Sequence, residues 1–547
     1  MLQDDAASRP RSASARAAAA GAAPGRSWSG RWAWLLGLGA GLTVVATLDG
    51  PGLTVDEPLD VRPGRTYLAV LQKQGRHFFD RDVVEKVFRD NAEHPPLGRW
   101  LLGIASVLGE PFEVLLKGKD PTDHYVLAGR LAPALTFAAL VGLVAGAAGR
   151  RWGTPAGVAA GFAMAILPRS FAHAHFGALD TFLSFFWTAA LLAGERALRS
   201  PRPVRAMAVA GAVWSLALLI KIHAWFLIPL LGIWSLVRLG LRRALGAMAV
   251  WFVVGVSLYW AGWPWLWYDT GNRLRAYWGT GVARTTILVE YLGRVYADRD
   301  VPWHYPWVYF AATVPVGLHA LGLIGLARAG KDRRREPFPL LLVGSILFFL
   351  VLFSTRIPVY DGERLFLHVF PAWALLIGFG FGWLWETVFT SRRGRVLLGG
   401  ILAAQAIGVV SMHPFGLSYY NALVGGLPGA RWLGLELTYW SDAIDRVLLD
   451  RLARAARPGS SAAMAPTLYP GQGIETTGFH RGLARRGLIL QDDPVAAECE
   501  WVVLSHRRAY LRDNLMDRLH RRGRLVATRS RWGVELSALW HVPSSSD

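Results

Sequence analysis

Long apolar segments separated by short polar connections fill the chain up to about residue 412. A helix rises ~1.5 Å per residue, so roughly 20 apolar residues cross a hydrocarbon core of ~30 Å. The recurrence predicts a mainly α-helical, polytopic membrane bundle of about eleven spans. We place them at residues 32–48, 125–148, 155–175, 179–195, 205–220, 222–238, 245–267, 306–327, 337–354, 365–388 and 396–412.

Two of these apolar stretches are divided by polar residues near their middle. As one helix, residues 204–238 would run ~52 Å, well beyond the hydrocarbon core. Lys221 and His223 lie at the centre of this stretch, which favours a helical hairpin with these two residues at its turn. Residues 155–195 divide in the same way, at the segment from His173 to Asp180.

Basic residues gather in alternate connections, which the positive-inside rule places in the cytoplasm. With eleven spans, these connections share the side of the basic N-terminal segment, so the N-terminus is predicted inside and the C-terminus outside. The connections near 50–124, 173–180, 221–223, 268–305 and 355–364 then face outward. The basic residues are Arg150 and Arg151; Arg196, Arg199, Arg202 and Arg205; Arg238, Arg242 and Arg243; Arg328, Lys331 and Arg333 to Arg335; and Arg392, Arg393 and Arg395.

The two ends of the chain lack this apolar pattern. Residues 1–30 are rich in Ala, Ser, Arg, Gly and Pro, which predicts a disordered basic cytoplasmic tail. Together with the following apolar run, this tail resembles a signal peptide. No clear cleavage site follows, and we expect an uncleaved first span. Residues 31–412 then form the transmembrane domain.

The first outer loop, residues 50–124, is long enough to carry structure of its own. Its segment 81–91 has helix-like spacing of apolar and charged residues, and residues 97–108 are apolar but too short to span. The second segment is therefore predicted to lie along the membrane interface.

Residues 413–547 are mixed in polarity and contain no further spanning run. Periodicity predicts an amphipathic helix over 441–456 and a helix over 510–521. Buried strands are predicted at 501–505, 525–528 and 533–540. We expect a small α/β domain on the outer side of the membrane.

Composition agrees with a membrane protein. The 547 residues are 53% hydrophobic and 18% charged, too apolar for one water-soluble fold of this length. A net charge of +20 can indicate a nucleic-acid partner, but the Arg residues lie between apolar segments, so topology explains them and no nucleic acid is expected. The 25 Trp suit aromatic belts, and the single Cys499 excludes an internal disulfide.

Ionisable residues near the spans concentrate at their predicted outer ends. A transporter would place coupling charges near the midplane, whereas few are predicted there. Polar groups at membrane spans are costly and are functional candidates by default, so the pattern favours a reaction chamber at the outer interface. The residues are Asp56, Glu57, Glu93, His94, His173, His175, Asp180, Lys221, His223, Arg356, Asp361, Glu363 and Arg364.

Asp56 and Glu57 follow the first span directly. A carboxylate within hydrogen-bond reach of an acceptor hydroxyl or amine can serve as general base, which is the role predicted for Asp56. Glu57 could orient Asp56 or bind acceptor. Periodicity alone slightly favours the alternative that the pair caps the next helix or forms surface ion pairs. His94 precedes the interfacial helix and could meet a phosphate there.

Asp180, Lys221, Arg356 and Arg364 also have two interpretations each. Asp180 opens a span and could simply cap it. The three cations could hold a lipid phosphate, or could merely extend to the interface. His173 and His175 suit a metal only if carboxylates join them, so no metal site is predicted.

The residues resemble the GT-C superfamily of membrane glycosyltransferases, in the branch (glycosyltransferase family 39 or related) that contains protein O-mannosyltransferases and lipid A aminoarabinose transferases. The likeness covers roughly residues 32–412. The segments that carry it are Asp56-Glu57, Glu93-His94-Pro95-Pro96-Leu97, Ala178-Leu179-Asp180, and Tyr360-Asp361-Gly362-Glu363-Arg364 followed by Pro371.

The resemblance implies sugar transfer from a polyprenyl-phosphate-linked donor, with inversion and with no cofactor or metal required. Asp56 would act as base; Asp180, Glu93 and His175 would bind acceptor or donor. His94 occupies the place of a phosphate-binding Lys in the aminoarabinose transferases, which implies a phosphate-binding role for it. Lys221, Arg356 and Arg364 are assigned to phosphate binding by their chemistry and their predicted side of the membrane. The acceptor could be a protein, a lipid or a glycan.

Two other functions stay open at this point. A transporter or flippase of a lipid-linked saccharide could use the outer polar residues as a vestibule, and a non-catalytic assembly protein could bind a partner through the outer domain. The transferase is preferred because topology and motif order agree. It is expected in a bacterial cytoplasmic membrane, with its active site facing outward.

Overall fold

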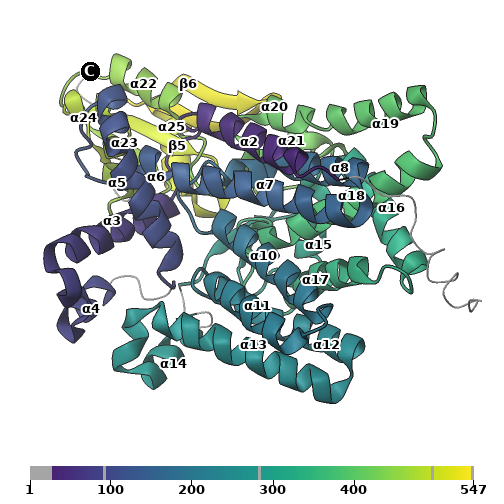
Figure 1. Cartoon of the computed structure of the whole chain (residues 1–547). Helices are drawn as coiled ribbons and strands as arrows, with labels where there is room; N and C mark the ends of the chain where they lie inside the picture. Colours follow the sequence, from purple (N-terminus) through teal and green to yellow (C-terminus); the bar gives the residue numbers. More distant parts are fainter. Residues whose placement is uncertain (1–27, 90–93, 281–284, 494–497, 544–547) are drawn as a thin grey trace, which may run out of the picture.

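The computed structural model describes residues 28–89, 94–280, 285–493 and 498–543. Almost all of the predicted basic tail therefore lies outside the described residues. The described part is mainly helical, as predicted, with a five-stranded sheet near the C-terminus (Figure 1).

Helices occupy all eleven of the segments predicted to span the membrane. They are α2 (Arg31–Ala46), α6 (Val126–Gly129) with α7 (Leu131–Trp152), α8 (Thr154–Ala165) with α9 (Pro168–His173), α10 (Asp180–Leu198), α11 (Pro203–Leu218), α12 (Leu227–Leu239), α13 (Leu241–Ala261), α15 (Tyr305–Thr313) with α16 (Val316–Asp332), α17 (Phe338–Leu352), α18 (Phe370–Thr387), and α19 (Arg392–Ala404) with α20 (Ile407–Met412).

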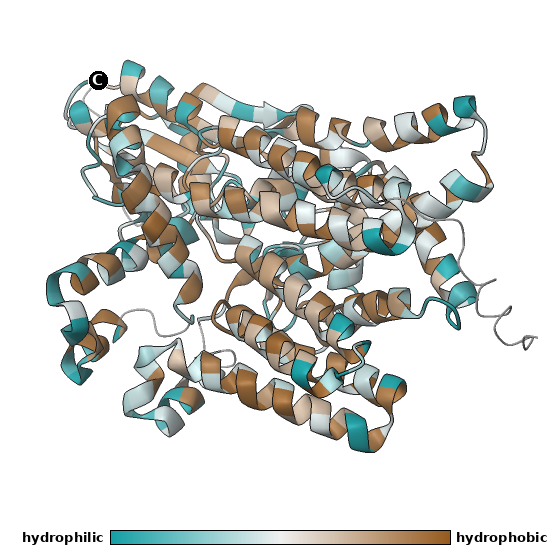
Figure 2. Cartoon of the chain, viewed as in Figure 1, coloured by the Kyte–Doolittle hydropathy of each residue, from teal (hydrophilic) through white to brown (hydrophobic). Residues whose placement is uncertain are grey.

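Five helical stretches are long and apolar enough to cross a membrane, namely Val126–Trp152, Ile222–Leu239, Leu241–Ala261, Arg364–Thr387 and Arg392–Met412. The pair α15 and α16 makes a sixth if it is one span, and it bends by 113° at Val314 and Pro315. Hydrophobic residues run along the helices and hydrophilic ones gather at the turns (Figure 2). The count of eleven crossings and the orientation remain predictions.

Both divided stretches break where the polar residues predict. Helix α11 ends at Leu218, and the short helix η3 (Ile222–Phe226) begins after Lys221. Helix α9 ends at His173, and α10 begins at Asp180. Both breaks bring costly polar side chains together at helix ends, which prepares the site described below.

The loop predicted to be the first outer one folds into α3 (Asp56–Gln74), η1 (Gly75–Phe79), α4 (Arg81–Val87) and α5 (Leu97–Lys117). Helix α5 is longer than the predicted 97–108, and it exposes Leu108, Phe112 and Leu115 along one side. This apolar face suits the predicted interfacial position. The backbones of α3 and α5 touch, because a Cβ on Gly103 would lie 2.3 Å from the carbonyl carbon of Gly64.

The 268–305 connection holds elements that the sequence does not predict. Helix η4 (Pro264–Tyr268) leads into α14 (Thr270–Thr280), and the strands β1 (Leu288–Tyr291) and β2 (Arg294–Ala297) form an antiparallel hairpin. Four-residue strands give too short an alternation to stand out from a loop.

After α20, a connecting segment carries η6 (Gly416–Ser418), η7 (Ala422–Val424) and α21 (Gly426–Trp432). The C-terminal region then forms the predicted α/β arrangement. Its strand order is β4-β3-β5-β7-β6, with β3 parallel to both of its neighbours and β7 antiparallel to both of its own. The elements are α22 (Arg446–Ala455), β3 (Ala462–Ala465), α23 (Gln472–Phe479), α24 (Arg481–Arg485), β4 (Leu490–Gln491), β5 (Trp501–Ser505), α25 (Asp513–Arg522), β6 (Arg524–Arg531) and β7 (Val534–His541), with the short η9 (Arg508–Tyr510) after β5.

Strand β5 matches the predicted range because all five of its side chains are buried at the centre of the sheet. Strand β3 was not predicted, because Ala-rich segments have a low strand propensity. The domain docks on the end of α5: Arg481 Nη2 donates to Glu113 Oε1 at 2.5 Å. Figure 1 shows it at the end of the bundle where α3 and α5 lie.

Candidate active site

Five charged residues from four separate connections between helices meet in one ion-pair cluster, which we call the central cluster: Asp56, Asp180, Lys221, Asp361 and Arg364. Lys221 Nζ donates to Asp180 Oδ1 at 2.6 Å. The guanidinium of Arg364 contacts three carboxylates: Asp56 Oδ2, Asp180 Oδ2 at 3.3 Å, and Asp361 Oδ2 at 2.9 Å. Residues more than 300 positions apart thus share one cation.

The cluster forms where helices begin. Asp56 is the first residue of α3 and Asp180 the first of α10, so both carboxylates lie in a first turn, where the helix dipole favours negative charge. Each carboxylate also pairs with a cation outside its own helix, Asp56 with Arg364 and Asp180 with both Lys221 and Arg364. Capping is therefore not their sole interaction, and their functional roles stay predictions.

Exposure differs sharply among the three carboxylates. The side chain of Asp56 is 26% exposed, whereas those of Asp180 and Asp361 are 4% and 3% exposed. The ring of Trp440 covers Arg364, with its centroid 4.1 Å from the guanidinium carbon. Asp56 is therefore the acid of the cluster that an incoming molecule can reach.

Glu57 points away from the cluster into a fully bonded site. Its Oε1 accepts from Arg130 Nε at 2.7 Å and from the Gly177 amide at 2.8 Å. Its Oε2 accepts from Arg130 Nη2 at 2.8 Å and from the Thr54 amide at 2.9 Å. With four hydrogen bonds and no exposure, this carboxylate has no lone pair left for an acceptor.

The partner of Glu57 explains what this arrangement does. Arg130 also donates to the carbonyls of Leu48, Pro51 and Gly52. The Glu57–Arg130 pair therefore fixes the turn between α2 and α3, and so the position of Asp56. Of the two predicted roles for Glu57, the geometry favours orientation over substrate contact.

His94 lies beside the central cluster, and Glu93 lies outside the described residues. The Leu97 amide at the start of α5 donates to the Leu219 carbonyl at 3.1 Å, which ties this segment to the Lys221 turn. Burial, with Arg99, Lys221 and Arg364 nearby, holds the pKa of His94 well below its usual value. A neutral imidazole can donate a hydrogen bond to a phosphate, but it brings no charge.

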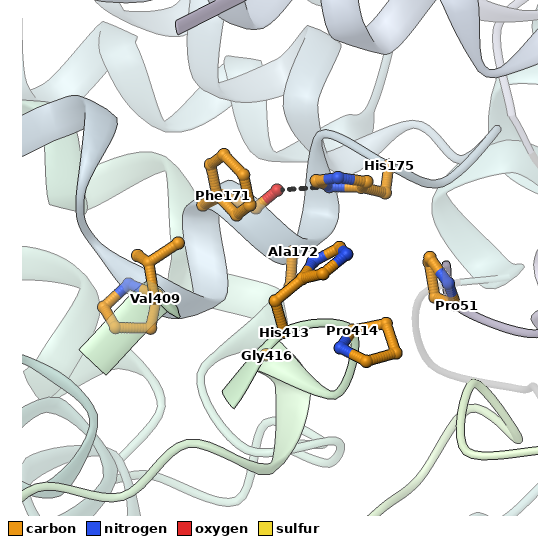
Figure 3. A pocket seen from close by; sticks show the side chains of 9 residues that line it. Pro51, Phe171, Ala172, His175, Val409, His413, Pro414 and Gly416 are labelled. Carbon is orange, nitrogen blue, oxygen red and sulfur yellow. Dashed lines mark hydrogen bonds between the residues drawn. The ribbon is translucent and has the colours of Figure 1, made fainter. Parts of the chain in front are cut away.

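Two histidines near the α9–α10 turn face different surroundings. His173 packs against the ring of Trp440, 5.0 Å away between centroids, near Arg364. His175 instead bonds the Phe171 carbonyl through Nδ1 and Thr47 Oγ1 through Nε2, both at 2.9 Å (Figure 3). Together with His413 it lines a small cavity, so both its nitrogens are engaged away from the cluster. His175 is thus less well placed to bind substrate than His173.

Arg356 is exposed on the loop between α17 and α18. No ion pair links it to the cluster within the described residues. The structure therefore brings together Asp56, Asp180, Lys221 and Arg364, with His94 beside them, and leaves Arg356 outside.

Sequence reasoning missed the residues that support the cluster from the C-terminal region. Arg507 Nη2 donates to Asp361 Oδ1 at 3.0 Å, and Arg507 Nε lies 3.6 Å from Glu436 Oε1. Trp440 belongs to the same region. No local signal marks Arg507, because it lies among other polar residues after a strand.

Buried pairs inside the bundle were also missed. Arg169 Nη1 donates to Glu363 Oε2 at 2.7 Å, and Arg99 Nε donates to Asp60 Oδ1 at 3.0 Å. Arg169 interrupts an apolar run, which could have marked it, since charges in such runs are costly. Within the residues that the structure describes, no group of three or more His, Cys, Asp or Glu side chains could hold a metal ion.

Residues 93–268 match the family model described as dolichyl-phosphate-mannose-protein mannosyltransferase. The predicted resemblance to GT-C glycosyltransferases is confirmed. With it the predicted enzyme class is confirmed as well. The matched stretch is roughly a third of the chain and includes His94, Asp180 and Lys221, but neither Asp56 nor Arg364.

Solved membrane glycosyltransferases are similar over most of the chain. ArnT from Cupriavidus metallidurans in the apo state is 16% identical, with 92% of this chain and 97% of that chain covered and a TM-score of 0.46. The Archaeoglobus fulgidus oligosaccharyltransferase in the apo form is 12% identical, with 87% and 69% covered and a TM-score of 0.42. At these values the likenesses assign no role to any residue here. No curated protein matches the chain.

Proposed function

We propose that the chain transfers a sugar from a polyprenyl-phosphate-linked donor to an acceptor at the outer face of the membrane, with inversion at the anomeric carbon and with Asp56 as general base. The observation that carries the proposal is the central cluster, in which one partly exposed carboxylate lies beside two buried cations. The description of the matching family, which names a dolichyl-phosphate-linked sugar, supports a polyprenyl phosphate as the carrier.

Lys221 and Arg364 are the proposed phosphate ligands. Asp180 bonds both cations, Lys221 through Oδ1 and Arg364 through Oδ2, and so sets their separation. Charge-assisted hydrogen bonds from Lys and Arg are the strong ligands of phosphate. They would also stabilise the charge that develops on the phosphate as the sugar leaves.

Donor binding would also free Asp56 from its ion pair with Arg364. Arg364 contacts Asp56, and a phosphate that binds this guanidinium would compete with the most exposed of its three carboxylates. Asp56 is then free to accept a proton from the acceptor hydroxyl or amine as that atom attacks the anomeric carbon. A phosphate leaving group needs no proton, so one carboxylate suffices where glycosidases use two.

Transfer from a panel of labelled polyprenyl-phosphate sugars into membrane acceptors tests the proposal. Wild type is compared with Asp56→Asn and with Asp80→Asn, which makes the same change at an exposed carboxylate in the same loop. We expect wild type and Asp80→Asn to transfer label from one donor and Asp56→Asn to lose transfer while still binding that donor.

Two outcomes would refute it. Equal transfer by Asp56→Asn and wild type would exclude Asp56 as base. Movement of a labelled lipid-linked saccharide across vesicles, with no transfer from any donor, would favour the flippase instead.

A further inference from the structure

A groove with a volume of ≈ 1120 Å³ lies along α7, α10 and α11, far from the central cluster. Helix α10 packs against both α7 and α11, which run alongside it (Figure 1). Asp180 and Arg196 lie at opposite ends of α10, 16 residues and thus ~24 Å apart. The groove reaches the Arg196 end, so it does not belong to the candidate active site.

The wall of the groove is apolar, with Leu143, Leu192, Val209 and Val213 among its side chains. Val209 is 68% exposed, so the groove opens at the surface of α11, one of the helices in the segments predicted to span the membrane. Its volume exceeds the roughly 300–1,000 Å³ of ordinary small-molecule pockets. A long apolar ligand that enters from the bilayer fits such a shape.

One end of the groove is strongly basic. Four of its lining residues are arginines: Arg150, Arg151, Arg196 and Arg199. Two of these have acidic partners, since Arg151 pairs with Glu195 and with Glu336 at 3.4 Å, and Arg199 pairs with Glu195 at 3.3 Å.

Among the residues that the structure describes, neither of the other two arginines, Arg150 and Arg196, forms an ion pair. Both line the groove. Two guanidinium groups without acidic partners at one end of a groove favour an anion there.

We propose that this groove binds an anionic glycerophospholipid of the leaflet opposite the active site. Its acyl chains lie along the apolar wall, and its phosphate lies between Arg150 and Arg196. Basic pockets between transmembrane helices on the cytoplasmic side are typical sites for anionic headgroups. A sugar donor bound here would lie too far from Lys221 and Arg364 to react, which favours a structural phospholipid over the carrier lipid.

Native mass spectrometry of the full-length protein tests the site directly. The protein is incubated with equal amounts of phosphatidylglycerol and phosphatidylcholine of the same acyl chains. We expect wild type to retain phosphatidylglycerol with at least tenfold preference, and Arg150→Ala/Arg196→Ala to lose that preference. The matched control is Arg242→Ala/Arg243→Ala, which removes two exposed charges at the start of α13, outside the groove.

Three results would overturn the proposal: equal retention of both phospholipids by wild type, equal loss in the test and control variants, or displacement of phosphatidylglycerol by an equal concentration of undecaprenyl phosphate. Val213→Trp keeps both arginines and fills the groove, so it covers the case in which the double variant does not fold. Loss of phosphatidylglycerol from Val213→Trp supports the site, and full retention refutes it.

Discussion

Asp56 and Glu57 are adjacent carboxylates whose removal should have opposite consequences. Glu57 is fully buried and hydrogen-bonds to Arg130 and two backbone amides. Asp56 is partly exposed and pairs with Arg364, which is also paired with Asp180 and Asp361. The isosteric changes Glu57→Gln and Asp56→Asn separate a stability role from a catalytic one.

The magnitudes follow from these surroundings. Glu57→Gln leaves Arg130 buried without a counter-charge and turns an amide NH₂ toward other donors, which costs about 3–5 kcal/mol. Asp56→Asn leaves Arg364 paired with Asp180 and Asp361, so the loss of stability is about 1 kcal/mol or less. Loss of a general base lowers the rate of transfer roughly 10²–10⁴-fold.

The assay is thermal unfolding of the detergent-solubilised protein at one scan rate, together with transfer under saturating donor. We expect Glu57→Gln to lower the unfolding midpoint markedly, and to keep transfer per folded molecule close to wild type at low temperature. Asp56→Asn should unfold like wild type and lose transfer. If Glu57→Gln were stable and inactive, the structural role assigned to Glu57 would be incorrect.

Three further predictions concern the surroundings of the cluster. Lys221→Met removes a charged phosphate ligand worth about 1.5–3 kcal/mol, so the KM for donor should rise roughly 10–150-fold. Arg356→Met should change this KM little. If both substitutions raised the KM by similar factors, Arg356 would also contact the donor. Arg507→Ala leaves Asp361 with Arg364 alone and removes one of the ion pairs that join the C-terminal domain to the bundle. Limited proteolysis should then release that domain faster, and unchanged proteolysis would refute the contact's importance. Burial raises the pKa of Asp442 to about 6, and its Oδ2 has no hydrogen-bond partner among the described residues. Between about pH 6 and the unfolded pKa near 3.8, the folded state binds a proton that the unfolded state has released, so the free energy of unfolding should rise as pH falls from 7 toward 4. Asp442→Asn should flatten this pH dependence, measured as the unfolding midpoint.

The helical segments were predictable because membrane insertion imposes length and hydropathy on them directly. Polar interruptions at Lys221 and at His173–Asp180 also marked the helix breaks, since charges there must face partners rather than lipid. The bend between α15 and α16 was not predicted, because the apolar run continues through it, although Pro315 at the bend is a helix-breaking residue.

The candidate site was predictable only in part. Residues such as Asp180 and Lys221 stand out in apolar surroundings, and their roles stay predictions. Asp56 and Glu57 have different surroundings because Glu57 pairs with Arg130, 73 positions away in the sequence, which no local pattern indicates. Arg507 and Trp440 reach the cluster only through the folding of a distant domain.

Because Trp440 and Arg507 lie late in the sequence, the central cluster is completed late in protein synthesis. Arg364 is covered by Trp440, and Asp361 is held by Arg507, from the last portion of the chain to be synthesised. At 5–20 residues per second, the ~140 residues between Arg364 and Arg507 take roughly 7–28 s to make. A nascent chain in that interval already holds the acids of the central cluster, but Arg364 gains its aromatic cover only when Trp440 is made, and Asp361 gains its second cation only with Arg507. Chains that stop before these residues therefore carry an incomplete central cluster.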